Sequence, residues 1–119
     1  MNYELKTKTP NPNYESVFDI EPTEVFENAS HFTLIDVREN DEFNGELGHI
    51  QTCSLVILST IPEKLKSIPT GKPVIFVCRS GARSAQACFY AHQQGLKNSF
   101  NMRGGMLLWN RLQFPTVKD

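Results

Sequence analysis

The 119-residue sequence has few cysteines, no excess of charge of either sign and no long apolar run. Its three cysteines are an odd number without a Cys-x-x-Cys pair, so neither a disulfide framework nor a zinc site is indicated. A net charge of −1 gives no general attraction to nucleic acid. No stretch approaches the roughly 18 apolar residues of a membrane span, and the polar beginning is unlike a signal peptide. We therefore expect a cytoplasmic protein with reduced cysteines and no nucleic-acid or membrane partner.

What the sequence does contain is an alternation of short apolar segments with helix-forming ones. Residues 1–16, which carry lysine, proline and asparagine, predict a mobile N-terminal arm, and residues 17–119 suit a single domain. Strands are expected at 17–20, 33–37, 54–57, 73–77 and 98–102. Helices are expected at 22–29, 40–43, 60–68, 83–94 and 106–112. This alternation predicts an α/β fold with a parallel sheet covered on both faces.

Residues 77–84, Val-Cys-Arg-Ser-Gly-Ala-Arg-Ser, carry the strongest chemical signal. They join an apolar strand to a helix, and ligand sites of open α/β sheets collect at the carboxyl ends of strands. N–H groups at the amino end of a helix hold anions and favour the thiolate form of a cysteine. Arg79 and Arg83 add positive charge, and Gly81 permits a tight turn. Cys78 is therefore the candidate nucleophile, and the alternative is an inert buried cysteine.

Four other polar residues belong to strand ends and loops near this edge of the predicted sheet. Asp36 and Arg38 are interpreted as structural residues that fix loops through hydrogen bonds and an ion pair, because a charge at a strand end needs a partner. His49 could serve as a base for Cys78, but no Asn or Asp pattern supports this, so it is interpreted as a structural loop residue. Arg103 precedes two glycines and lies either near the mouth of the same site or in solvent.

The helical segments also predict which side chains are buried. Phe26, Cys88, Trp109 and Leu112 are expected to face the core. His92 is close to the end of its helix and is expected in solvent, where a positive charge suits the helix dipole.

The order and spacing of several motifs resemble the rhodanese family of sulfurtransferase-type domains. The matching segments are Leu-Ile-Asp-Val-Arg-Glu at 34–39, Glu-Phe at 42–43, Gly-His-Ile at 48–50, the stretch 77–84, and Gly104-Gly105 followed by Trp109. Together they cover about residues 17–114. After residue 50 relatives usually continue with a Pro-Gly-Ala-x-Asn-like turn, whereas residues 51–55 here are Gln-Thr-Cys-Ser-Leu. Cys53 is either a second redox thiol that resolves a persulfide or a replacement for a small buried residue.

The resemblance implies a three-layer fold with a central parallel five-stranded sheet, and no metal or organic cofactor. It implies that Cys78 takes a sulfane sulfur from an anionic donor such as thiosulfate and passes it from a persulfide to a thiol or cyanide-like acceptor. A protein is a further candidate acceptor. The substrate-binding residues implied or inferred are Arg79, Ser80, Gly81, Ala82, Arg83, Ser84 and Arg103. The alternative function is a non-enzymatic sulfur-carrier or partner-binding module.

A cysteine phosphatase is the other alternative, because such enzymes also place a thiolate between a strand and a helix. Their family pattern separates the cysteine from an arginine by five residues, whereas four residues separate Cys78 from Arg83. A shorter loop makes a smaller cradle, which suits a terminal sulfur better than a tetrahedral phosphate. We therefore expect no phosphatase activity.

Overall fold

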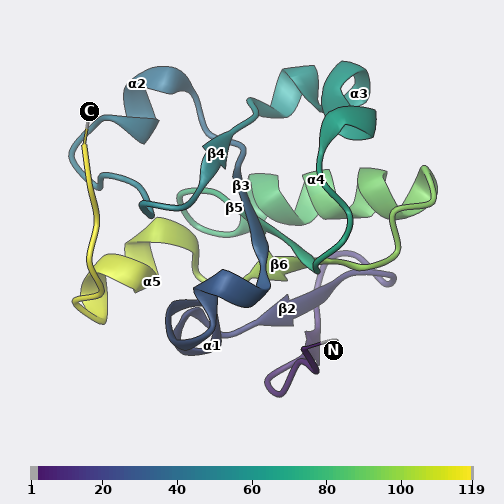
Figure 1. Ribbon diagram of the computed structural model, residues 1–119, viewed down its shortest axis with the longest axis horizontal. Helices are drawn as coiled ribbons and strands as arrows, with labels where there is room; N and C mark the ends of the chain where they lie inside the picture. Colours follow the sequence, from purple (N-terminus) through teal and green to yellow (C-terminus); the bar gives the residue numbers. More distant parts are fainter. Residues whose placement is uncertain (1–2, 119) are drawn as a thin grey trace.

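The computed structural model describes residues 3–118, which are built around one six-stranded sheet (Figure 1). The strands are β1 (Thr9–Pro10), β2 (Phe18–Ile20), β3 (Thr33–Asp36), β4 (Ser54–Leu55), β5 (Val74–Val77) and β6 (Ser99–Met102). Their spatial order is β1-β2-β6-β5-β3-β4. The five strands from β2 to β4 are parallel, as expected, and β1 adds a sixth, antiparallel strand at the edge. The carboxyl end of β5 therefore lies in the middle of the sheet.

Helices cover both faces of this sheet. They are α1 (Pro22–Glu27), α2 (Asn40–Phe43), α3 (Ile61–Lys64), α4 (Ala82–Gln93) and α5 (Gly105–Arg111), with three single 3₁₀ turns at Ala29–His31, Leu58–Thr60 and Leu65–Ser67. Figure 1 shows α1 and α5 on one side of the sheet and α3 and α4 on the other. α4 is the longest helix, because no proline or glycine interrupts the chain before Gly95, whose φ of 97° ends it. Within residues 3–118, no helix combines the length and apolar character needed to cross a membrane.

Two apolar cores result from the alternation of side chains along the central strands. Phe76 packs on the face that also contains Cys88 of α4. Ile75 and Val77 pack on the opposite face with Trp109 of α5. Every residue of β5 is buried, which explains why its sequence is apolar throughout rather than alternating.

Three of the predicted side-chain placements are wrong. Phe26 and Leu112 are each 42% exposed, although both were expected in the core. Phe26 stacks on Phe114 at a ring-centroid distance of 4.4 Å, and Leu112 lies just beyond the last turn of α5. His92 is buried rather than solvated, because its Nε2 lies 2.9 Å from the carbonyl oxygen of Ser99. Cys88 and Trp109 are buried as predicted.

The described part of the expected N-terminal arm, residues 3–16, is joined to α1 and β2. The buried carboxylate of Glu24 accepts hydrogen bonds from the Tyr3 hydroxyl, the Lys6 N–H and both the N–H and hydroxyl of Thr7. Burial acts to raise the pKa of Glu24, but these hydrogen bonds outweigh it and lower the pKa. Asn11 donates from its side chain to Asp19 at 2.9 Å. Residues 1 and 2 of the arm lie outside the described residues.

Candidate active site

Cys78 follows β5 directly and lies against the first turn of α4. Gly81 has a φ of 101°, a left-handed conformation that turns the loop back toward the sulfur. As a result, the N–H of Gly81 donates to Cys78 Sγ at 3.1 Å. The Ser84 hydroxyl lies 3.2 Å from the same sulfur. The residue is 0% exposed, so its sulfur is surrounded by donors inside the protein rather than by water.

The first turn of α5 holds the backbone of this loop. The N–H of Met106 donates to the Cys78 carbonyl at 2.8 Å, and the N–H of Leu107 donates to the Arg79 carbonyl at 2.9 Å. Gly105 permits this approach, because a Cβ atom there would lie 2.5 Å from both carbonyl oxygens. The sequence indicates a turn at Gly104-Gly105, but not that the helix after it fixes the backbone of the Cys78 loop.

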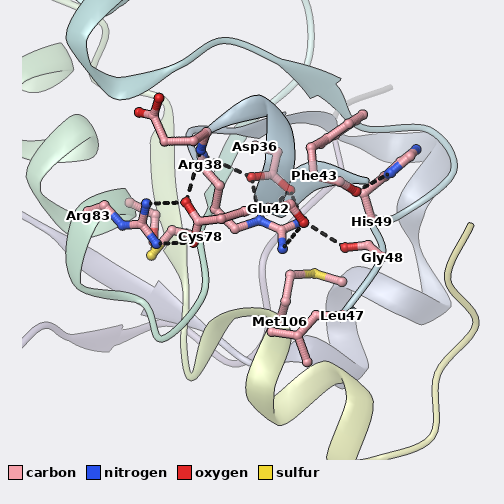
Figure 2. A network of polar contacts seen from close by, with 12 residues as sticks. Asp36, Arg38, Glu42, Phe43, Leu47, Gly48, His49, Cys78, Arg83 and Met106 are labelled. Atoms are coloured by element: carbon pink, nitrogen blue, oxygen red, sulfur yellow. Dashed lines mark hydrogen bonds and ion pairs between the residues drawn. The ribbon is translucent and has the colours of Figure 1, made fainter. Parts of the chain in front are cut away.

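Arg83 lies near Cys78, but its guanidinium is bound to a carboxylate. Its two terminal nitrogens donate to Glu42 at 2.7 and 2.8 Å, as Figure 2 shows. These hydrogen bonds are the main cause that lowers the pKa of Glu42 to about 2. They also raise the pKa of Arg83, to which the charge of Glu42 adds a smaller contribution. The predicted second cation at the sulfur is thus already paired.

Asp36 and Arg38 form a buried ion pair next to Glu42. Arg38 is 1% exposed, and it donates from Nε and a terminal nitrogen to both oxygens of Asp36, the closest at 2.7 Å. Its remaining donors reach the carbonyl oxygens of Glu42 and Gly48. The pair therefore ties α2 to the loop before β4, in the arrangement shown in Figure 2. His49 follows in that loop, with Nδ1 2.8 Å from the Phe43 carbonyl and its ring stacked on Phe43.

The other predicted site residues lie at the surface of the loop or at a neighbouring strand end. Arg79, Ser80 and Ala82 are exposed. Arg79 also lines a recess of about 400 Å³ together with residues of the α2 region and α5. Arg103 follows β6 and binds the carboxylate of Glu21, with its closest contact at 2.5 Å. The structure thus brings Gly81, Ser84 and Arg83 around Cys78, and it pairs Arg103 with the residue before α1.

Two residues next to the site were not singled out from the sequence. The Ser84 hydroxyl lies 2.5 Å from Asn101 Oδ1 in β6, and Asn101 Nδ2 donates to Asp19 Oδ1 in β2 at 2.9 Å. These residues are 17 and 82 positions apart along the chain, so no local motif connects them. The signal that could have identified them is a polar residue inside each of two strands that are otherwise buried.

The two remaining cysteines are in surroundings that disfavour the thiolate. Burial raises the pKa of Cys88 to about 12. Burial also raises the pKa of Cys53, and the nearby charge of Asp36 raises it further. Among residues 3–118 no three His, Cys, Asp or Glu side chains are grouped so that they could hold a metal ion.

Comparison with known proteins identifies relatives of this chain and of its fold. Residues 3–112 match the family model of the rhodanese-like domain. The chain is 39% identical over 84 residues to a sulfurtransferase of Allochromatium vinosum, which covers 71% of this chain and 77% of the relative. It is 41% identical over 76 residues to the putative sulfurtransferase YtwF of Bacillus subtilis, covering 64% and 71% of the two chains. A rhodanese-related protein from Thermoplasma volcanium superimposes with a TM-score of 0.79 at 31% identity, covering 85% of this chain and 98% of that one.

Proposed function

The chain belongs to the family of rhodanese-like domains, and from this premise we propose that it is a sulfurtransferase that carries sulfur on Cys78. Two of its relatives are named as sulfurtransferases, one of them putatively. The observation that carries the proposal is the Gly81 N–H, which donates to the Cys78 sulfur at 3.1 Å, with the Ser84 hydroxyl 3.2 Å from the same atom. Such donors stabilise negative charge on sulfur, and a nucleophilic thiolate requires this stabilisation.

The proposed reaction has two displacement steps. The Cys78 thiolate attacks the outer sulfur of a donor such as thiosulfate, the sulfur–sulfur bond of the donor breaks, and sulfite leaves with the electron pair. A thiolate or cyanide-like acceptor then attacks the outer sulfur of the persulfide, and the Cys78 thiolate is regenerated. No electrons are gained or lost overall, so the cycle needs no redox cofactor.

The loop supports this chemistry in two further ways. The Cys78 and Arg79 carbonyls are held by the N–H groups of Met106 and Leu107, and this fixes the backbone from which the Gly81 N–H donates to the sulfur. Arg79 is exposed beside the recess of about 400 Å³ and is the candidate for attracting an anionic donor. Because Cys78 is 0% exposed, a donor reaches the sulfur only when the residues that cover it move aside.

The pairing of Arg83 with Glu42 favours a second candidate function, a sulfur carrier that exchanges sulfur with another protein. A guanidinium that already binds a carboxylate through two hydrogen bonds is a weaker site for a small anion. A protein donor could supply its own contacts around the loop. Arg83 is also unavailable as the oxyanion-binding arginine of a phosphatase, in agreement with the short loop.

Intact mass spectrometry after incubation with thiosulfate tests the proposal. We expect one added sulfur on the full chain, lost in Cys78→Ser and kept in Cys53→Ser. Turnover with thiosulfate and cyanide then separates an enzyme from a carrier, because a carrier forms the persulfide without rapid turnover. Absence of a Cys78 persulfide with thiosulfate and with a protein persulfide donor would contradict both functions. Hydrolysis of an aryl phosphate that depends on Cys78 would instead support the phosphatase.

A further inference from the structure

A chain of hydrogen bonds leads from the Cys78 sulfur through α4 and β6 to a carboxylate in β2. It runs from Cys78 Sγ to the Ser84 hydroxyl, then to the side-chain amide of Asn101, and ends at Asp19. All four residues are buried, with Asp19 the most exposed at 5%. Polar groups in such a place act on one another more strongly than in water.

Asp19 determines which way the Asn101 amide faces. A carboxylate oxygen accepts hydrogen bonds but donates none, so the Nδ2 group of Asn101 must face Asp19. The Oδ1 atom of Asn101 therefore faces Ser84. Asn11 of the N-terminal segment donates to the same oxygen of Asp19 at 2.9 Å, which adds a second donor to the carboxylate.

Ser84 has one hydroxyl proton and two acceptors within reach. Asn101 Oδ1 is 2.5 Å from the hydroxyl oxygen, whereas Cys78 Sγ is 3.2 Å away. If the proton points to Asn101, the sulfur is best satisfied as a thiol that donates its own proton to Ser84. If the proton points to the sulfur, it stabilises a thiolate, but Asn101 Oδ1 loses the hydrogen bond from Ser84 inside the protein.

We propose that Asn101, oriented by Asp19, is a positioning residue that draws the Ser84 proton away from Cys78 and holds the resting cysteine as a thiol. To form the thiolate, Cys78 releases its proton to solvent and the Ser84 hydroxyl turns toward the sulfur. The amide oxygen of Asn101 opposes this turn, so Asn101 restrains the reactivity of the cysteine. The inference rests on the proposed function only in taking Cys78 as the nucleophile.

Alkylation of the full chain with iodoacetamide tests the inference, because the thiolate alone displaces iodide and no sulfur donor is involved. Asn101→Leu removes the competing acceptor at similar size, and we expect alkylation of Cys78 at neutral pH to be about fivefold faster, the effect of one net hydrogen bond. Ser84→Ala should be slower than wild type. In the Ser84→Ala background Asn101→Leu should have no effect, which a general loosening of the structure would not produce. Asn28→Ala, which removes a side-chain amide that donates to the Glu24 carbonyl outside this chain of hydrogen bonds, serves as the control with an unchanged rate.

An independent spectroscopic measurement covers the case in which Asn101→Leu does not fold. Asn101→Ala then replaces it, and the S–H stretching band of Cys78, identified by its loss in Cys78→Ser, is recorded in the wild type. We expect this band at the frequency of a hydrogen-bonded S–H group. A band of a free S–H group, an unchanged or slower alkylation in a folded Asn101 variant, or equal acceleration with and without Ser84 would each overturn the inference. The two proposals can also fail separately. If the protein takes sulfur from no donor but the Asn101 and Ser84 variants change the alkylation rate as expected, the proposed function is refuted and the inference stands.

Discussion

Cys78 and Cys88 are both 0% exposed, one just before α4 and one in its middle, but their sulfur atoms have different neighbours. Cys78 Sγ accepts a hydrogen bond from the Gly81 N–H at 3.1 Å and has the Ser84 hydroxyl at 3.2 Å. Cys88 lies in the apolar core, with the hydroxyl of Ser99 3.7 Å away. Burial raises the pKa of Cys88 to about 12.

The difference shows that burial alone does not decide what a cysteine can do. Removing a thiol from water disfavours its charged form, as it does at Cys88. Oriented donors can replace the lost water, and at Cys78 the Gly81 N–H donates to the sulfur while the Ser84 hydroxyl lies within reach of it. The candidate site is therefore distinguished by the loop and its supports rather than by the residue type.

Selective alkylation should show the largest effect of this difference. With a pKa of about 12, roughly one Cys88 in a thousand is a thiolate at pH 9. We expect iodoacetamide to modify Cys78 faster than Cys88 in the native chain, by up to about a thousandfold, the limit set by the small thiolate fraction of Cys88, as measured by peptide mass spectrometry. In urea the two cysteines should react at similar rates. Equal rates in the native protein would remove the distinction between the two environments.

Gly105→Ala should disrupt the surroundings of Cys78 without touching Cys88. The added Cβ would lie 2.5 Å from the carbonyl oxygens of Cys78 and Arg79, and the φ of 57° is unfavourable for alanine. Displacement of the loop should lower the rate of sulfur loading about a hundredfold, as expected for a misplaced reactive group. Gly95→Ala is the matched control, because its φ is 97° but nothing lies within 4 Å of its Cβ. If both variants load sulfur equally slowly, backbone strain and not the contact with the loop is responsible.

The sequence allowed the fold and the position of Cys78 to be predicted, because both depend on local patterns. The apolar segment before Cys78 and the glycine turn after it are readable within a few residues. The partners that surround the sulfur were not predictable in this way. Arg83 pairs with a glutamate 41 residues earlier, and Asn101 reaches Asp19 from 82 residues away. Such contacts are set by which strands become neighbours, and a single sequence contains no local signal for that.

Cys78 is expected to carry the sulfur, whereas replacing either arginine of its loop should affect binding of the donor rather than the transfer of sulfur. Arg79→Ala should raise KM for thiosulfate about tenfold with little change in kcat, because a charge-assisted hydrogen bond is lost in ground and transition states alike. Arg83→Ala should change KM in the same direction, since it also leaves Glu42 unpaired near the site. Steady-state kinetics measure both, and Lys72→Ala, whose ammonium binds the Ser30 carbonyl, is the control. Unchanged KM in Arg79→Ala would mean that this side chain does not meet the donor, and unchanged KM in Arg83→Ala would mean that the unpaired Glu42 carboxylate does not repel it.

The smallest expected effect is the contribution of the Glu42–Arg83 ion pair, close to Cys78, to the free energy of unfolding. Glu42 has its pKa lowered from 4.5 to about 2, chiefly by the hydrogen bonds from Arg83. A depressed pKa means that the native state binds fewer protons than the unfolded state, so stability is present above pH 4.5 and is lost as the pH falls toward 2. Because the pair is partly exposed to solvent, we expect Glu42→Gln to lower the free energy of unfolding by about 1 kcal/mol at pH 7.

Urea unfolding of Glu42→Gln and wild type at pH 7, 4 and 2.5 measures this contribution, with Glu46→Gln, an exposed glutamate of the same segment, as the control. The difference between wild type and Glu42→Gln should shrink as the pH falls, since the protonated glutamate loses its advantage over glutamine. A difference that is independent of pH, or absent, would mean that the ion pair does not hold Arg83 in place. Arg83 would then be free to bind the sulfur donor, and both arginines of the Cys78 loop would act on the substrate. A difference that shrinks as expected assigns Arg83 mainly to the fold and leaves Arg79 as the cation that meets the donor.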